Sequence, residues 1–162
     1  MAIVIEAPNE VYSIETNRNL KLFVGGGITN CPDWQSEFIG LLSEYSNLTI
    51  FNPRRKNFPI NDPLAAEQQI VWEYNHLLES DIVSFWFSDG SLNPITLYEL
   101  GKWGNSTNKK LFVGCDKHYQ RRQDVIIQTA LARPEIVVAD GIRQLASQII
   151  QVILSDMMNR KH

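Results

Sequence analysis

Short apolar runs alternate with longer amphipathic segments along most of the chain. The runs are rich in β-branched and aromatic residues, which favours buried strands. They are Leu20 to Val24, Leu48 to Asn52, Asp81 to Phe87, Lys110 to Gly114 and Ile136 to Val138. Because a segment with helical spacing follows each of the five runs, the pattern predicts a parallel sheet with helices on both faces.

The segments between the runs place apolar residues three and four positions apart, as an amphipathic helix does. Five helices are predicted. The first begins near Trp34, the second spans Leu64 to Leu78, and the third starts at Asn93-Pro94. The fourth spans Arg121 to Ala132, and the fifth follows a cap at Asp140. In the second of these helices the apolar face is predicted to consist of Ile70, Val71, Tyr74 and Leu78. Right-handed crossovers leave few arrangements of five such strands, and we predict the flavodoxin-like order 2-1-3-4-5.

The N-terminal residues fit this scheme less directly. Two further apolar runs, Ala2 to Glu6 and Glu10 to Ile14, flank Ala7-Pro8-Asn9 and predict either a small hairpin or an N-terminal edge of the sheet. We therefore interpret residues 1–19 as an extension of a single domain that spans 1–162. A chain of 162 residues can form one sizeable core, but it is short for two domains.

Charge and composition exclude several partners. The 15 basic and 18 acidic residues give a formal charge of -3, which does not favour a nucleic acid polymer or an anionic membrane. We also expect no membrane insertion, since every apolar run is shorter than the roughly 20 residues that span a bilayer. Cys31 and Cys115 form no CxxC pattern and no leader is recognisable, so a cytoplasmic location is expected.

Several familiar site motifs are missing from the sequence. The Gly25-Gly26-Gly27 turn follows a strand but lacks the third glycine of a dinucleotide-binding GxGxxG motif. There is neither a GxxxxGK[ST] phosphate loop nor a GxSxG elbow. The three histidines are scattered without metal-ligand spacing, and we therefore predict no metal site.

Carboxylates and amides lie near the ends of the predicted strands. Glu99 is in the second turn of the helix after the Asp81 to Phe87 run, Glu73 is on the preceding helix, and Asp89 and Asn93 lie in the loop between. A glycosyl transfer that retains configuration needs an attacking carboxylate and a proton donor for the leaving group, and these residues could supply both. Alternatively, Glu99 and Glu73 are solvated helix residues, which spacing alone favours.

Five segments together resemble the nucleoside 2-deoxyribosyltransferase family. They are FVGGGITNCPDWQSEF (23–38), FNPRR (51–55), SDIVSFWF (80–87), NPITLYELG (93–101) and VGCDKHYQRRQDV (113–125). The resemblance is closest to the branch with GG…CPDWQ, NPRR and PIxLxELG motifs. It covers Leu20 to Val138 and implies a flavodoxin-like fold.

The resemblance also implies roles for individual residues. Glu99 corresponds to the family's nucleophile, and Glu73 and Asp89 to acids near the base. A deoxyribosyl group would be transferred between bases through a covalent intermediate on Glu99. No cofactor is implied, because a sugar without a 2′-hydroxyl reaches an oxocarbenium-like transition state more easily.

The substrates implied are a 2′-deoxynucleoside or deoxynucleotide and a free nucleobase. Candidate binding residues are Gly25, Gly26 and Gly27 for the sugar, Trp34 for base stacking, and Asn52, Arg54, Asn93 and Asp124. Arg54 and Arg55 could bind a 5′-phosphate or pair with surface acids. Asp124 stands where relatives donate an amide residue across a subunit contact, so a homo-oligomer is expected. Phe23 stands where relatives have a tyrosine bonded to the nucleophile.

Two other functions remain open at this point. Water could replace the second base, which would make the protein an N-glycoside hydrolase that uses the same intermediate. A non-catalytic nucleotide-binding module on the same fold is the alternative from a different class, because a fold alone does not carry an activity.

Overall fold

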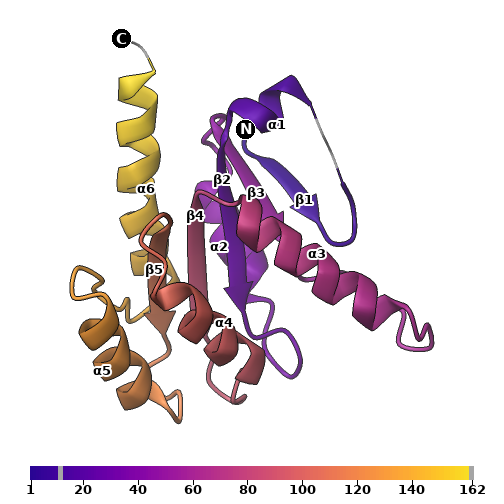
Figure 1. Ribbon diagram of the computed structural model, residues 1–162, viewed down its shortest axis with the longest axis vertical. Coiled ribbons are helices and arrows are strands. Elements are labelled where there is room, and N and C mark those ends of the chain that lie inside the picture. Colours follow the sequence, from indigo (N-terminus) through magenta and orange to yellow (C-terminus); the bar gives the residue numbers. More distant parts are fainter. Residues whose placement is uncertain (11–12, 161–162) are drawn as a thin grey trace.

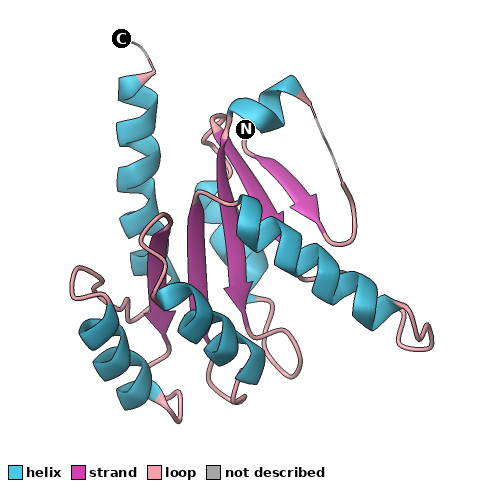
Figure 2. Ribbon diagram, in the orientation of Figure 1, coloured by secondary structure: helices cyan, strands magenta, loops and turns pink. Residues whose placement is uncertain are grey.

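The protein forms a five-stranded sheet with helices on both faces (Figures 1 and 2). It is described by a computed structural model that covers residues 1–10 and 13–160. The strands are β1 (Ile3–Glu6), β2 (Leu20–Gly26), β3 (Leu48–Asn52), β4 (Ile82–Phe87) and β5 (Lys110–Cys115). They all run parallel, in the order β1-β3-β2-β4-β5. The predicted α/β, flavodoxin-like fold class is therefore confirmed.

The predicted strand order is right for four strands and wrong for the fifth. The strands predicted at 48–52, 20–24, 81–87 and 110–114 are adjacent in that order. Ile136 to Val138 is not a strand, and Ala139 alone forms a parallel bridge, with Gly114. A turn bond from the Ile136 amide to the Arg133 carbonyl and the start of a helix after Gly141 leave too few residues for a longer ladder.

The fifth strand is instead the N-terminal β1, at the opposite edge. It pairs in parallel with β3, from Ile3 opposite Thr49 to Glu6 opposite Asn52. The alternative of an N-terminal edge of the sheet is thus confirmed, whereas the hairpin depends on residues that the structure does not describe. The predicted second strand of that hairpin, Glu10 to Ile14, includes residues 11 and 12, which lie outside the described residues, and a short helix α1 (Ile14–Arg18) follows, capped by Ser13.

Five longer helices cover the sheet. They are α2 (Trp34–Leu42), α3 (Ala65–Glu79), α4 (Pro94–Gly104), α5 (Arg122–Ala132) and α6 (Ile142–Asn159). Helices α3, α4 and α5 lie on one face of the sheet, and α2 and α6 lie on the other (Figure 1). Alternate strand residues serve the two faces: Phe23 packs with Trp72 and Trp103, whereas Leu22 and Val24 pack with Phe38 and Ile149.

The apolar face predicted for α3 is wrong. Ile70, Val71, Tyr74 and Leu78 are each about half exposed or more. The buried positions are Ala65, Trp72, His76 and Leu77. The indole and imidazole rings of Trp72 and His76 stack with their centroids 4.0 Å apart, which lets a histidine occupy a core position. The face of α3 that packs on the sheet therefore includes polar residues, which a prediction from hydrophobic residues alone overlooks. Glu73 follows directly after Trp72 in the sequence.

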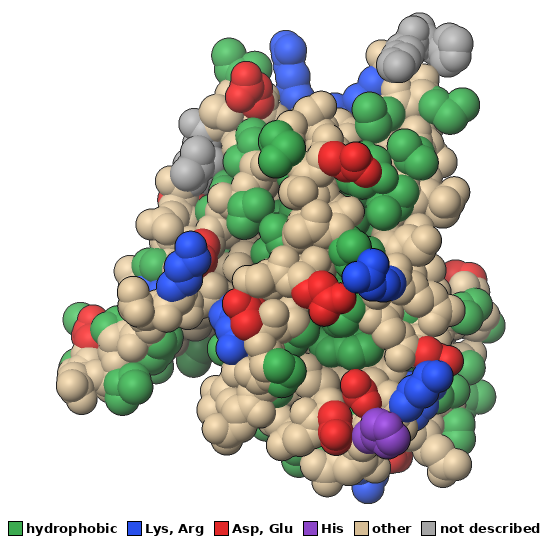
Figure 3. Space-filling view, turned by 180° about the vertical axis from the view of Figure 1, so that it is seen from behind, with side chains coloured by type: hydrophobic (Ala, Val, Ile, Leu, Met, Phe, Trp, Pro, Cys, Tyr) green, Lys and Arg blue, Asp and Glu red, His purple; other side chains and the backbone are tan. Residues whose placement is uncertain are grey.

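The protein surface carries both charge signs. On the face opposite to that of Figure 1, basic and acidic side chains are interspersed (Figure 3). Within residues 1–10 and 13–160, none of the helices is both long and apolar enough to cross a bilayer.

Candidate active site

A glycine turn at the carboxyl end of β2 forms one wall of the candidate site. A Cβ on Gly26 would lie 2.6 Å from the carbonyl oxygen of Trp86, and a Cβ on Gly27 would overlap the side-chain oxygen of Asn93. The Gly27 carbonyl accepts hydrogen bonds from Trp34 Nε1 at 2.9 Å and Gln35 Nε2 at 3.2 Å. Only glycine fits this approach of β2 to the β4–α4 loop, so the turn presents its backbone rather than side chains.

Asn93 connects that turn to helix α4. It adopts a left-handed conformation with φ 50°, which asparagine tolerates better than most residues. Its side-chain amide donates to the carbonyls of Ser88 and Ser91, both at 3.1 Å, and its side-chain oxygen accepts from the Cys31 thiol at 3.4 Å. With Pro94 in the first turn of α4, this network fixes where the helix starts and hence where Glu99 lies.

The glycine turn, the start of α4 and the inner side of α3 enclose a cleft of about 720 Å³. Phe23 of β2 is part of its lining, and Arg55, Phe58 and Ile60 come from the loop after β3. The cleft lies at the carboxyl edge of the sheet beside the adjacent strands β2 and β4, where open α/β sheets bind ligands. The volume is large enough for a nucleoside-sized molecule.

Glu99 projects from the second turn of α4 into this cleft. Burial, reinforced by the negative charge of Glu73, raises the pKa of Glu99 to about 8, although nearby Lys102 acts in the opposite direction. Neither carboxyl oxygen of Glu99 has a hydrogen-bond partner in the part of the chain that the structure describes. Phe23 lines the same cleft and has no hydroxyl group to offer.

Glu73 faces Glu99 from helix α3. Burial raises its pKa too, although a hydrogen bond from Gln69 Nε2 to Glu73 Oε1, 2.7 Å long, partly opposes the shift. Two neighbouring carboxyl groups with raised pKa values share protons as a pair, and one proton stays on the pair near neutral pH. The arrangement provides an anionic nucleophile and a proton donor in one half-enclosed space.

Five of the eleven residues predicted for the site do not line the cleft. Asp89 is exposed in the turn after β4 and accepts from the Gly90 amide. Trp34 is buried behind the glycine turn, and Asn52 accepts from the Arg54 amide at 3.0 Å. Arg54 donates to the carbonyls of Cys31 and Pro32, and Asp124 pairs with Arg121 at 3.0 Å and lines a different groove, between α4 and α5. The six that line it are Gly25, Gly26, Gly27, Glu73, Asn93 and Glu99.

Gln69 was not singled out from the sequence although it lines the cleft, and Arg55 was considered only together with Arg54 as a phosphate ligand. Arg55, rather than its neighbour Arg54, faces the cleft. Gln69 lies one helical turn before Glu73 on the same side of α3. The i, i+4 spacing of Gln69 and Glu73 was a usable signal, because residues four apart share a helix face.

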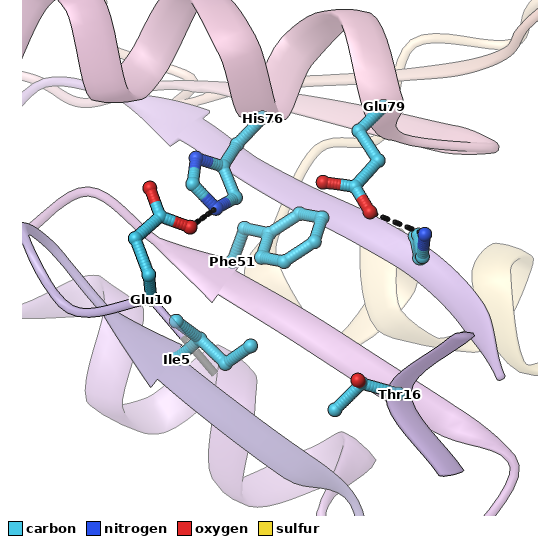
Figure 4. A pocket seen from close by; sticks show the side chains of 7 residues that line it. Ile5, Glu10, Thr16, Phe51, His76 and Glu79 are labelled. Carbon is cyan, nitrogen blue, oxygen red and sulfur yellow. Dashed lines mark hydrogen bonds and ion pairs between the residues drawn. The ribbon is translucent and has the colours of Figure 1, made fainter. Parts of the chain in front are cut away.

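A second, much smaller cavity of about 10 Å³ lies beside helix α3 nearer its carboxyl end (Figure 4). Its glutamates are paired: Glu79 with Lys21, and Glu10 with the Nε2 atom of His76 at 3.4 Å. The space holds no more than one water molecule. We find no group of three or more His, Cys, Asp or Glu side chains suited to a metal ion within residues 1–10 and 13–160.

The comparison with protein families identifies related proteins. The model of a family described as nucleoside 2-deoxyribosyltransferase like matches residues 19–119, more than half of the chain. The match includes every residue that lines the cleft, and it excludes β1 and α6. No match was found among curated proteins.

Proposed function

The chain belongs to the nucleoside 2-deoxyribosyltransferase-like family, and on that premise we propose that it transfers 2-deoxyribose from one nucleobase to another. Membership supports a transferase of this general kind. The finer steps, including a covalent deoxyribosyl-Glu99 intermediate, are our proposal. The observation that carries it is the pair of carboxyl groups, Glu99 and Glu73, in one cleft with raised pKa values.

In the first half-reaction the Glu99 carboxylate attacks C1′ of a 2′-deoxynucleoside. The C1′–N bond to the base breaks, and the bonding electrons leave with the base nitrogen. Glu73 in its acid form gives its proton to the base, so that a neutral base leaves and Glu73 becomes a carboxylate. The products are a deoxyribosyl ester on Glu99 and a free nucleobase. In the second half-reaction an incoming base attacks C1′ and gives its proton to Glu73, while the C1′–O bond of the ester breaks and its electrons restore the Glu99 carboxylate.

The raised pKa values let the pair of carboxyl groups hold one proton near neutral pH, and a carboxyl pair that holds a proton there can supply an acid. Glu99 has to be ionised to attack, and the proton that the pair holds must therefore reside on Glu73 in the reactive form. Among the residues that the structure describes, neither group forms an ion pair, which keeps both carboxyl groups available for this exchange.

Sugar recognition is proposed to involve two parts of the structure. The backbone of Gly25, Gly26 and Gly27 lies open to the cleft and can approach the sugar closely. Asp124 does not line the cleft of its own chain. We therefore keep the proposal that the protein works as a homo-oligomer in which Asp124 reaches the site of a neighbouring copy, which size-exclusion chromatography with light scattering can test.

The test of the proposed function is a base-exchange assay. The protein is incubated with deoxyinosine and free uracil, and the products are separated. Formation of deoxyuridine is expected. Release of free deoxyribose without deoxyuridine would instead indicate a hydrolase, and no turnover would indicate a binding module. In parallel, intact-protein mass spectrometry with deoxyinosine alone should show one added deoxyribosyl group, which Glu99→Gln should remove.

A further inference from the structure

Two buried polar atoms on the α3 side of the cleft lack a hydrogen-bond partner. Within the described residues five buried side-chain N or O atoms are in this state, and Gln69 Oε1 and Arg55 Nη1 are the ones whose residues line the cleft. Leaving a buried donor or acceptor unpaired is costly, and native proteins have few such atoms. One of these two atoms is an acceptor and the other a donor, which points to a ligand that offers both complementary groups.

The orientation of Gln69 is fixed by its neighbours. Its Nε2 donates to the Pro53 carbonyl at 2.7 Å and to Glu73 Oε1 at 2.7 Å. The Pro53 carbonyl can only accept, so the amide group cannot rotate to exchange its nitrogen and oxygen without losing that bond. Gln69 Oε1 therefore remains an acceptor that waits for an N–H or O–H group.

Arg55 is held equally firmly. Its Nε donates to the Ala7 carbonyl at 3.3 Å, its Nη2 donates to Gln68 Oε1 at 2.9 Å, and its guanidinium lies 5.4 Å from the centre of the Phe58 ring. Guanidinium nitrogens only donate, so Nη1 is a charged donor that requires an acceptor. Its neighbour Arg54 offers no such group to the cleft, because it binds the loop before α2.

We propose that Gln69 and Arg55 determine base specificity, and that they select a nucleobase in which a ring N–H lies beside a carbonyl group. Gln69 Oε1 accepts a hydrogen bond from the ring N–H, and Arg55 Nη1 donates to the carbonyl oxygen. Hypoxanthine, guanine, uracil and thymine present this edge. The proposal rests on the proposed function, since it names the bases that the same cleft accepts.

The chemistry of the two groups favours this edge over that of adenine or cytosine. Those bases also place a donor beside an acceptor, but their acceptor is a ring nitrogen. A guanidinium group binds most strongly to oxygen acceptors, through short charge-assisted bonds. The apolar side chains of Phe58 and Ile60 line the same end of the cleft and can contact the faces of the ring. Because Gln69 also binds Glu73, the residue that recognises the base positions the acid that protonates it.

The test compares nucleosides that differ only at this edge. For purines, deoxyinosine is compared with purine 2′-deoxyriboside, which lacks both the ring N–H and the carbonyl. For pyrimidines, deoxyuridine is compared with the 2′-deoxyriboside of 2-pyrimidinone. The ratio of kcat/KM within each pair is measured for the wild type and for Gln69→Leu and Arg55→Met. Dividing the variant ratio by the wild-type ratio cancels the intrinsic difference in leaving-group ability.

We expect the preference for the carbonyl-bearing base to fall by at least about 10-fold in each variant, since a site built around hydrogen bonds rejects an analogue without them. The matched control is Lys56→Met, which removes an exposed cation beside Arg55 that does not line the cleft. It should leave the ratio unchanged. If a variant does not fold, calorimetry on the wild type makes the same comparison. It measures the affinity for hypoxanthine relative to that for purine, and the affinity for uracil relative to that for 2-pyrimidinone.

The outcomes separate this inference from the proposed function. Turnover with an unchanged ratio in both variants would overturn the base assignment and leave the transferase standing. A wild-type preference for deoxyadenosine or deoxycytidine over deoxyinosine and deoxyuridine would overturn it as well. Absence of turnover with tighter binding of hypoxanthine or uracil would support the base site and overturn the transferase. Absence of both turnover and binding would overturn both.

Discussion

Two of the three glutamates of helix α3, Glu79 and Glu73, lie in opposite surroundings. Glu79, near its carboxyl end, pairs with Lys21 beside the small cavity of Figure 4. Glu73, less than two turns earlier, lies in the large cleft, where its neighbours are the amide of Gln69 and a second carboxyl group, that of Glu99. Both glutamates are partly buried on one helix, but one has a cation beside it and the other has an anion.

The difference between the surroundings of Glu79 and Glu73 distinguishes a charge that stabilises the fold from a charge that is suited to catalysis. A partly buried carboxylate with a cation partner is compensated and stays ionised. Placing a second carboxyl group beside it instead raises the pKa of both groups and leaves a proton to be shared, an arrangement typical of catalytic sites. The cleft pair therefore reduces stability at high pH, a cost that the proposed chemistry explains.

The largest expected effect comes from removing the carboxylate that attacks the sugar. Glu99→Gln should lower kcat/KM for base exchange by roughly 10³-fold or more, because an amide cannot form the ester intermediate. Steady-state kinetics with deoxyinosine and uracil measures it. Glu79→Gln, the same change at the paired glutamate, should leave kcat/KM within about 3-fold of wild type. If kcat/KM fell equally in the two variants, the proposed difference between the cleft and the small cavity would be wrong.

A smaller effect is expected at Glu73. Glu73→Gln should lower the maximal rate by about 10²-fold, because the departing base loses its proton donor. In the wild type, kcat/KM should fall as the pH rises through about 8, because the carboxyl pair then loses the proton that Glu73 must donate. Glu73 is one of the causes of the high pKa of Glu99, so in Glu73→Gln the remaining carboxyl group ionises at lower pH and the fall near pH 8 disappears. An unshifted pH profile would contradict the pairing.

The smallest effect concerns stability. The pKa of Glu99 is about 8 in the folded protein and near 4.5 when unfolded, so the folded state holds the extra proton between these values. Stability is therefore unaffected below pH 4.5 and falls as the pH rises from 4.5 to 8. With screening by water at the cleft mouth, the loss is about 2 kcal/mol. Urea unfolding at pH 5 and pH 8.5 should show this loss, and Glu99→Gln should reduce it.

Glu37 provides the control for the stability measurement. It is an exposed glutamate on α2, on the opposite face of the sheet. Glu37→Gln should leave the difference in unfolding free energy between the two pH values as it is in the wild type. If Glu99→Gln behaved in the same way as Glu37→Gln, the carboxyl group of Glu99 would not be the source of the pH dependence.

Most of the fold was predictable because buried parallel strands produce continuous apolar runs. Such runs identified β2 to β5 and their order. The fifth predicted run failed because Ile136 to Val138 lies between a turn at Arg133 and the start of α6, and an apolar run does not reveal how many residues are free to pair. The buried face of α3 was missed because Trp72 and His76 pack together there, which a count of aliphatic residues does not detect.

The site was predictable where a residue follows directly from a strand end. The glycine turn, Asn93 and Glu99 line the cleft for that reason. Choosing between Arg54 and Arg55 depends on which way each side chain turns after Pro53, and that direction is set by distant partners, the loop before α2 and the carbonyl of Ala7. Long-range contacts of this kind leave no local pattern in the sequence.

The edge strand β1 gives the chain an additional way to vary. It lies outside the part that matches the family, yet the carbonyl of Ala7, directly after it, anchors the guanidinium of Arg55 in the cleft. Under the proposed role of Arg55 in base recognition, changes in the first ten residues can retune which base is accepted while every side chain of the cleft stays the same. An N-terminal segment of this kind is a natural target for evolving or engineering new base preferences.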